Sequence, residues 1–409
     1  MSERLDLTGP AQPAEAAELA ELSEQIYRLI DAELPAACAL RREIHANPRL
    51  SGEEQDTADL ICANIGIDFT GIAETGAYTR LGPESGPAIA VRGEMDALPV
   101  EEETGVSWAS TNGAMHACGH DVHMAGLAAF VRAAKQLRLP VALLPILQPR
   151  EEKHPSGAYD VRESGLFDAQ NVAYAIGVHV HPGVAKGAVA TGAGVVNAEA
   201  GVLKIRVHGQ GGHGAYPHLS RDVVAPLAAI AAGIHEVVRR TVDPMHPALV
   251  SVGQMIADGG AANVLPNEGL IHATIRTTRR EDTLRLVEAL RAMTEQTAAA
   301  YNVSGDLEYI FGEPVLANDA ALSVAMDQIL REKGLEVAAP MRSLGADDFA
   351  FFSDAVPSVM AFVGTRAADD TDFLPLHNPR FLPDEDAVRR VAYTMAAGYL
   401  AGAELLLAE

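Results

Sequence analysis

The sequence contains few cysteines, few aromatic residues and few cations. Of its 409 residues, three are cysteine and one is tryptophan, and 31 Lys and Arg face 55 Asp and Glu, which gives a formal net charge of −24. Three cysteines are too few, and odd in number, for a disulfide framework. A chain this acidic repels nucleic-acid phosphates and anionic lipids, so no nucleic-acid or membrane partner is expected. Such a chain can still bind cations.

The chain also lacks targeting and membrane-spanning patterns. No apolar run approaches the ~18–20 residues of a transmembrane helix. The first residues, MSERLDLTGPAQPAEAAELAE, have neither the basic region nor the apolar region of a signal peptide. We therefore expect a cytoplasmic protein. At ~100–200 residues per domain, the length predicts two or three domains.

The first half of the chain shows an alternation of helices and strands. Leucine and isoleucine recur at helical spacing from about residue 14 to 46, with an interruption expected at Pro35, and Asn47–Pro48 ends this helix. A second helix is expected to follow, with Ser51 as its N-cap. Apolar strands then alternate with helices as far as residue 180. This order predicts an α/β domain with a mostly parallel sheet.

The pattern changes near Gly192. Strands are predicted at 200–207, 248–255, 270–277 and 307–311, and helices at 222–239 and 283–300. The order βαββαβ is typical of a ferredoxin-like domain. We therefore predict that one α/β domain, formed by residues 1–192 and 311–409, is interrupted by an inserted ferredoxin-like domain at 193–310.

Ligand-type side chains are concentrated between residues 115 and 123. The segment Met115–His123 holds one thiol, Cys118, one carboxylate, Asp121, and three imidazoles, including His120. Thiolate and imidazole are preferred ligands of zinc and similar transition ions. A single histidine is more often an ordinary polar residue, but five such groups on one glycine-containing turn indicate a metal site.

Further polar residues follow predicted apolar strands. Glu151 and Glu152 come just after a strand that ends near residue 147, where α/β sheets place ligands. His179 ends another apolar strand, and His377 lies in a predicted loop near the C-terminus. Each is weak evidence alone, since an isolated Glu-Glu pair is more often a solvated turn.

Taken in order, these segments resemble the dinuclear-metal amidohydrolase branch of the carboxypeptidase and aminoacylase family. That branch contains hippurate hydrolases, N-acyl-amino-acid deacylases and auxin-conjugate hydrolases. The resemblance extends over nearly the whole chain from about Leu40. Its landmarks are Arg41–His45, Gly93–Pro99, His116–Asp121, Gln148–Glu152, Gly211–Gly214, Asn263–Pro266, Thr274–Thr277, Asp347–Phe349 and His377–Pro379.

The resemblance implies a metallopeptidase-type catalytic domain and an inserted domain that acts as a lid and dimerisation module. It implies two divalent metal ions (Mn, Zn, Co or Ni), and as their ligands Cys118, His120, Glu152, His179 and His377. Glu151 becomes the general base and Asp96 a carboxylate that steadies the site. His213 is expected to reach the active site of a partner subunit in a homodimer or dimer-based oligomer. Asn263 and Arg276 are expected to hold the small-molecule substrate.

The sequence thus predicts a metal-dependent amidohydrolase that cleaves an N-acyl amino acid or a related small conjugate. Glu94 stands where this branch usually has Asp, and Lys153 and His154 follow the Glu pair where relatives usually carry small residues. His181 faces the same side of an extended strand as His179, so either can be the ligand. These departures keep two alternatives open: hydrolysis of another C–N bond, in an aromatic amine or a dipeptide, and a non-catalytic binding protein.

Overall fold

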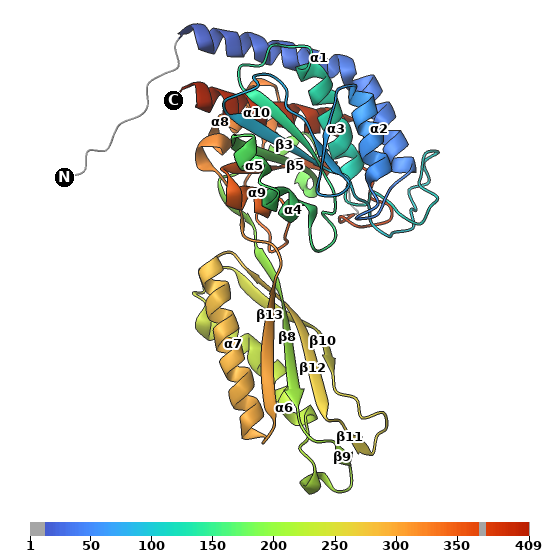
Figure 1. Ribbon diagram of the computed structural model, residues 1–409, viewed down its shortest axis with the longest axis vertical. Coiled ribbons are helices and arrows are strands. Elements are labelled where there is room, and N and C mark those ends of the chain that lie inside the picture. The colour runs from blue at the N-terminus through green and yellow to red at the C-terminus, as the bar shows by residue number, and fades with distance from the viewer. Residues whose placement is uncertain (1–12, 368–373, 409) are drawn as a thin grey trace, which may run out of the picture. The chain divides into compact units, whose positions relative to one another are not determined.

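The computed structural model describes residues 13–367 and 374–408, and the chain forms two compact units (Figure 1). The first unit contains the chain up to Val196, Ala317–Met341 and the residues from Phe351 onward. The second unit contains Asn197–Leu316 and Arg342–Ala350. None of the described helices is long and apolar enough to cross a membrane.

The first unit is built on an eight-stranded sheet in the order β1-β2-β4-β3-β5-β16-β6-β15. Its central strands β4, β3, β5 and β16 are parallel to one another, whereas β2 and β6 join them in antiparallel fashion. This large mixed sheet confirms the predicted α/β class. The strands are β1 (Thr70–Ile72), β2 (Gly76–Tyr78), β3 (Ala88–Glu94), β4 (Ala142–Gln148), β5 (Val172–Ala185), β6 (Ala188–Ala190), β15 (Glu336–Val337) and β16 (Ser358–Arg366).

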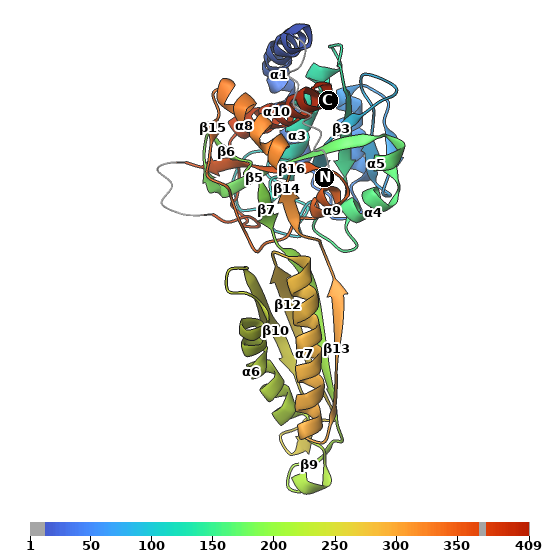
Figure 2. The same ribbon diagram turned by 90° about the vertical axis from the view of Figure 1, so that its left-hand side faces the viewer.

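Two buried helices of the first unit cross closely on this sheet. Every residue of α3 (His120–Ala134) is buried, and most of α10 (Asp386–Leu407) is buried with it (Figure 2). A Cβ added at Gly126 would lie 2.6 Å from Val391 Cγ1, so the small residue permits the close approach. The other helices of this unit are α1 (Pro13–Ala46), α2 (Gln55–Ile65), α4 (Gly157–Glu163), α5 (Leu166–Ala169), α8 (Ala320–Glu332) and α9 (Ala350–Ala355).

Two expectations about the first helices are wrong. α1 continues through Pro35 without interruption. A proline removes only one amide donor, and buried Ile30 and Leu40 on either side hold the helix in the core. α2 begins at Gln55, so Ser51 is not its N-cap and its hydroxyl instead donates a hydrogen bond to Asp96 Oδ2 at 2.6 Å.

The second unit has a four-stranded antiparallel sheet in the order β10-β12-β8-β13, with helices α6 and α7. Burial alternates along β12, and its buried side packs with residues of both helices. In chain order the elements are β8 (Glu199–His208), α6 (Val224–Thr241), β10 (Ala248–Ile256), β12 (Glu268–Thr277), α7 (Arg280–Ala300) and β13 (Ser304–Phe311). A separate two-stranded sheet of this unit is formed by β9 (Gly212–His213) with β11 (Val264–Leu265). Where the chain passes from one unit to the other, β7 (Gly194–Asn197) pairs with β14 (Leu316–Asn318).

Candidate metal centre

Ligand-type side chains meet at the carboxyl ends of the parallel strands β3, β4 and β5. Asp96 follows β3 by two residues, Glu151 and Glu152 follow β4, and His179 lies in β5. α3 begins beside them with His120. Because parallel strands end at the same edge of a sheet, segments far apart in the sequence converge here, where α/β sheets bind ligands.

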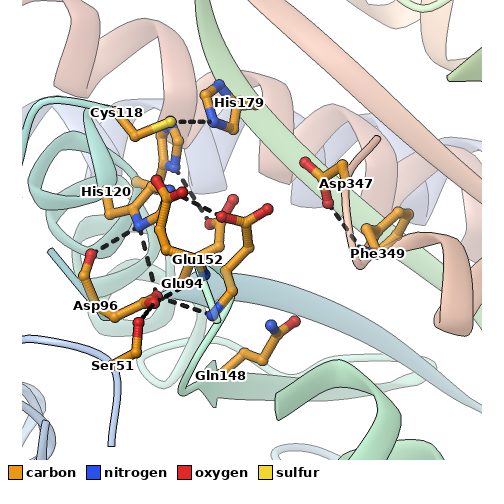
Figure 3. A network of polar contacts seen from close by, with 12 residues as sticks. Ser51, Glu94, Asp96, Cys118, His120, Gln148, Glu152, His179, Asp347 and Phe349 are labelled. Carbon is orange, nitrogen blue, oxygen red and sulfur yellow. Dashed lines mark hydrogen bonds and ion pairs between the residues drawn. The ribbon is translucent and has the colours of Figure 1, made fainter. Parts of the chain in front are cut away.

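The five predicted metal ligands lie close together. Possible ligand atoms of Cys118, Glu152 and His377 lie within 4.8 Å of one another. Cys118 Sγ is 3.4 Å from His179 Nε2 (Figure 3), and His377 Nε2 is 3.3 Å from Glu152 Oε1. A second group joins His120 and Glu152 to Glu151. Glu152 belongs to both groups and therefore links them.

Both buried imidazoles are held in the form that can ligate a cation. His120 Nδ1 donates to the carbonyl oxygen of Asp96 at 2.8 Å, and His179 Nδ1 donates to that of Val180 at 2.6 Å. A carbonyl only accepts, so each Nδ1 carries a proton, and in the neutral ring Nε2 is the atom free to ligate. His120 Nε2 is buried and has no hydrogen-bond partner among the residues described. The donor set therefore fits borderline metal ions such as zinc.

Charges and burial favour the ligating forms of His179 and Glu152, whereas the carboxylates around His120 raise its pKa. Burial, aided by nearby His123, holds the pKa of His179 well below its ordinary value, so the ring is neutral. Burial raises the pKa of Glu152, but the hydrogen bond from His377 and the nearby imidazoles outweigh it and keep the pKa below the usual value. An ionised carboxylate and a neutral imidazole are the forms that bind cations.

Asp96 orients the turn that carries the two glutamates (Figure 3). Its Oδ1 accepts from the amide of Glu151 at 3.0 Å, and its Oδ2 accepts from the amide of Glu152 at 2.9 Å. Asp96 itself is 1% exposed. Glu151 Oε2 lies 3.9 Å from His120 Nε2, so its carboxylate faces the same group of ligands.

His181 has a different environment from His179. Its Nδ1 accepts a hydrogen bond from the amide of Gly183 at 2.9 Å, and its ring contacts Phe362. Burial lowers the pKa of His181. The structure places His179, but not His181, beside Cys118 and His120. Of the two histidines that the sequence left open, His179 therefore has the position of a ligand.

The remaining predicted residues belong to the second unit. β9 pairs with β11 so that His213 faces Val264, and His213 and Asn263 line one hollow of about 490 Å³. The hollow lies next to the beginning of β12, whereas Arg276 is half-buried near the carboxyl end of that strand. From Glu268 to Arg276 the strand advances eight residues, or about 27 Å at about 3.4 Å per residue. The second unit thus brings His213 and Asn263 together and holds Arg276 apart from both.

Comparison with known proteins identifies the family. Residues 90–398 match the family described as Peptidase family M20/M25/M40. The chain belongs to this family. It is 34% identical over 362 residues to the N-acetyl-L-cysteine deacetylase of Bacillus subtilis (strain 168), covering 87% of this chain and 85% of that protein. It is 35% identical over 310 residues to the N-acyl-L-amino acid amidohydrolase of Geobacillus stearothermophilus, covering 72% and 82%.

A solved member of the M20 family has the same fold. The YXEP protein of Bacillus subtilis, described as a dinuclear metal binding peptidase from the M20 family, superimposes with a TM-score of 0.78 at 27% identity, covering 92% of this chain and 99% of that one. Together with the donor groups at the strand ends, these matches confirm that this M20-family chain is a metal-dependent amidohydrolase.

Glu94 and His123, which the sequence left without a role, lie in a buried group with His120 and His179 whose possible ligand atoms are within 4.8 Å of one another. Glu94 and His123 are both fully buried, and Glu94 Oε2 lies 3.2 Å from His123 Nδ1. His123 Nε2 accepts from the amide of Val180, next to His179, at 2.9 Å. Arg92 Nη1 lies 3.1 Å from Glu94 Oε1. His123 was part of the conspicuous 115–123 cluster, but spacing alone could not separate a ligand from a residue that supports one.

Proposed function

We propose that this M20-family enzyme hydrolyses the amide bond of N-acyl amino acids at a site for two divalent cations. The observation that carries the proposal is the convergence of thiol, imidazole and carboxylate donors around Glu152, with both buried imidazoles in the ligating tautomer. The ligands are Cys118, His120, Glu152, His179 and His377. Mn, Zn, Co and Ni all accept such a mixed donor set.

The cations, when bound, lower the pKa of a water molecule and polarise the substrate carbonyl. Glu151 acts as the general base: its carboxylate takes a proton from the attacking water and delivers it to the nitrogen of the departing amine. Two observations support this role. Asp96 fixes the backbone of Glu151, and Glu151 Oε2 lies 3.9 Å from His120 Nε2, so the carboxylate faces the ligand atoms of His120 and Glu152.

The second unit is proposed to be a ferredoxin-like lid and dimerisation module. Its βαββαβ order and its sheet order β10-β12-β8-β13 support the fold assignment. Edge strand β10 contains no charged residue and exposes Val252, Met255 and Ile256. The opposite edge, β13, carries Asp306 and Glu308, and charges of this kind discourage pairing. The β10 edge therefore suits a second copy of the chain.

A dimer also explains the distribution of the predicted substrate residues. A small substrate cannot span about 27 Å, so it cannot touch Arg276 and the His213–Asn263 hollow of the same chain. We propose that Arg276 binds the substrate carboxylate through its guanidinium fork, and that His213 and Asn263 come from the partner subunit. His213 then donates a hydrogen bond to the oxyanion that forms on the amide carbon.

Metal analysis combined with a substrate screen tests the proposal. The purified enzyme is expected to hold two divalent ions per chain and to hydrolyse N-acetyl and N-benzoyl amino acids faster than dipeptides or aromatic amine conjugates. Glu151→Gln serves as the inactive control. If the enzyme holds its metal ions but hydrolyses only dipeptides or aromatic conjugates, the proposed substrate class is wrong. If it hydrolyses none of the C–N substrates, the protein is a binding protein rather than an enzyme. None of the three cysteines forms a disulfide, which fits a reducing cytoplasm, the compartment that we propose.

A further inference from the structure

Three consecutive backbone amides in the turn after β4 donate to buried carboxylates. The amides of Glu151 and Glu152 donate to the two oxygens of Asp96, at 3.0 and 2.9 Å. The preceding amide, that of Arg150, donates to Oε1 of Glu54 at 2.9 Å. The turn that presents both glutamates is therefore fixed by two carboxylates from segments that lie far from it in the sequence.

Glu54 is a fully buried carboxylate with a partner at each oxygen. It precedes α2, its exposed fraction is 0%, and its Oε2 accepts a hydrogen bond from Thr75 Oγ1 at 2.7 Å. Burying a carboxylate is unfavourable unless hydrogen bonds replace its hydration. Here one replacement comes from the amide of Arg150, so the position of the turn and the burial of Glu54 depend on each other.

The backbone of the turn needs such support because Arg150 has a φ of +51°, which L side chains rarely adopt. Its carbonyl accepts from the amide of Gly157 at 3.0 Å, and its guanidinium pairs with Asp160. Gly157 itself passes so close that an added Cβ would lie 1.8 Å from the carbonyl oxygen of Pro149. Without the Glu54 anchor, we expect Arg150 to relax toward an ordinary conformation and to strain the two Asp96 hydrogen bonds that hold Glu151 and Glu152.

We propose that Glu54 is a positioning residue of the active site: by holding the Arg150 amide, it sets the direction of the Glu151 and Glu152 side chains. This inference rests on the proposed roles of Glu152 as a metal ligand and Glu151 as the base. The side-chain hydrogen bonds described for Glu54 come from the Arg150 amide and the Thr75 hydroxyl, so its proposed action on the glutamates runs through the backbone of the turn. Outer hydrogen bonds that orient metal ligands typically change metal affinity or activity by about 10–100-fold when removed.

Metal binding measures this role independently of catalysis. Zn²⁺ alone is titrated into the metal-free protein in competition with a chromophoric chelator. Glu54→Leu, which removes the acceptor, is expected to weaken Zn²⁺ binding by about 10–100-fold. Glu54→Gln keeps a side-chain oxygen for the Arg150 amide and is expected to stay near wild type. Thr75→Val is the matched control, since it removes the other hydrogen bond of Glu54 and leaves the turn held.

Two further measurements test the same role if the Glu54→Leu protein does not fold. Glu54→Asp keeps the charge but withdraws the oxygens by about 1.5 Å, the length of one C–C bond, and is expected to weaken Zn²⁺ binding in the same direction. Amide hydrogen exchange in a peptide covering residues 149–153 should accelerate in Glu54→Asp and not in Thr75→Val. In steady-state kinetics with an N-acyl amino acid, Glu54→Asp should lower kcat by a larger factor than it raises KM.

The outcomes separate the two proposals. Wild-type Zn²⁺ affinity and unchanged exchange at residues 149–153 in Glu54→Asp and Glu54→Leu would overturn the positioning role. An equal loss in Thr75→Val would also overturn it, since the effect would then belong to the burial of Glu54 in general. An enzyme that shows the expected Zn²⁺ losses but hydrolyses no N-acyl amino acid would support the positioning role and overturn the proposed substrate class.

Discussion

Asp121 accepts a hydrogen bond from Arg41 Nε at 2.9 Å, and each side chain is only 1% exposed. Asp121 follows His120 at the beginning of α3. The other nitrogens of Arg41 donate to the carbonyl oxygens of Pro383 at 2.7 Å and Asp384 at 3.1 Å. One guanidinium thus ties the start of α3 to the loop that follows His377.

Replacing Arg41 should destabilise the first unit strongly. Arg41→Met removes the guanidinium partner of buried Asp121 and leaves it only His45, 3.0 Å away, and breaking a buried pair costs about 3–5 kcal/mol. The neighbouring Arg42 is the matched control, since its pair with Glu385 is about half exposed and Arg42→Met should cost about 0–1 kcal/mol. Urea unfolding followed by circular dichroism measures both. Equal midpoints for the two variants would contradict the prediction.

His45 should make stability depend on pH above neutrality. Burial lowers the pKa of His45, but Asp121, 3.0 Å from Nδ1, and Glu102, 3.1 Å from Nε2, outweigh burial and raise it above the ordinary value of about 6.5. A raised folded-state pKa stabilises the fold fully below about pH 6.5, and this contribution is lost as the pH rises through the folded-state value. His116 acts in the opposite direction: burial lowers its folded-state pKa to about 3, so near pH 6 only the unfolded state binds a proton there, and His116 is neutral in both states only well above pH 6.5.

The measurement is the urea midpoint between about pH 6 and 9 for wild type and His45→Gln. The stability difference between wild type and His45→Gln isolates His45 from the other histidines: it should be largest near pH 6 and should shrink as the pH rises through the folded-state pKa of His45. If the midpoint changes with pH by the same amount in both proteins, the folded and unfolded states bind the same number of protons at His45 in this range, and the prediction is wrong.

The two adjacent glutamates should respond differently to the same substitution. Glu151→Gln removes a base and should lower kcat by about 10²–10⁴-fold with both metal ions retained. Glu152→Gln removes a charged ligand that both donor groups share, so it should lower the metal content itself. Elemental analysis and steady-state kinetics on the same preparations distinguish these effects. A Glu151→Gln enzyme with wild-type kcat and full metal would show that the base is another group.

Cys118→Ser should weaken the binding of at least one ion. A thiolate is a better ligand for borderline metals than a neutral hydroxyl, and Cys118 Sγ lies among the donor atoms of Glu152 and His377. Cys62→Ser is the control, because Cys62 lies in α2 against the core and burial raises the pKa of its thiol to about 11. Metal content is measured after dialysis against a weak chelator. Two ions retained in Cys118→Ser would exclude the thiol as a ligand.

The donor groups were predictable from the sequence because they are concentrated in short segments. Cys118 and His120 are two residues apart in a cluster of such groups, and Glu152 lies four residues after a buried strand, so the pattern marks them as candidates, while the full ligand set came from the family resemblance. The α/β class was predictable for the same reason, since strands and helices differ in the period of their apolar residues.

The residues that hold these donor groups in place could not be predicted in the same way, because no sequence pattern marks them. Glu54 acts on a backbone amide 96 residues away, and an amide has the same chemistry at every position except proline. His45 meets Glu102 across 57 residues. The continuity of α1 through Pro35 depends on tertiary packing that no local propensity contains. Position in the fold, rather than residue type, defines these roles.

The proposed cross-subunit role of His213 makes a prediction that a role within one chain cannot match. Glu151→Gln and His213→Ala are each expected to be inactive, and their subunits are mixed in equal amounts and allowed to exchange. If His213 acts on the partner's site, each mixed dimer has one site with both groups intact and one with neither. About half of randomly mixed dimers are mixed, so about a quarter of wild-type activity should return. His218→Ala, in the same exposed loop, is the control and should be active alone. If His213 serves its own chain, every site in a mixed dimer lacks one group, and verified exchange without recovered activity would rule out the cross-subunit role.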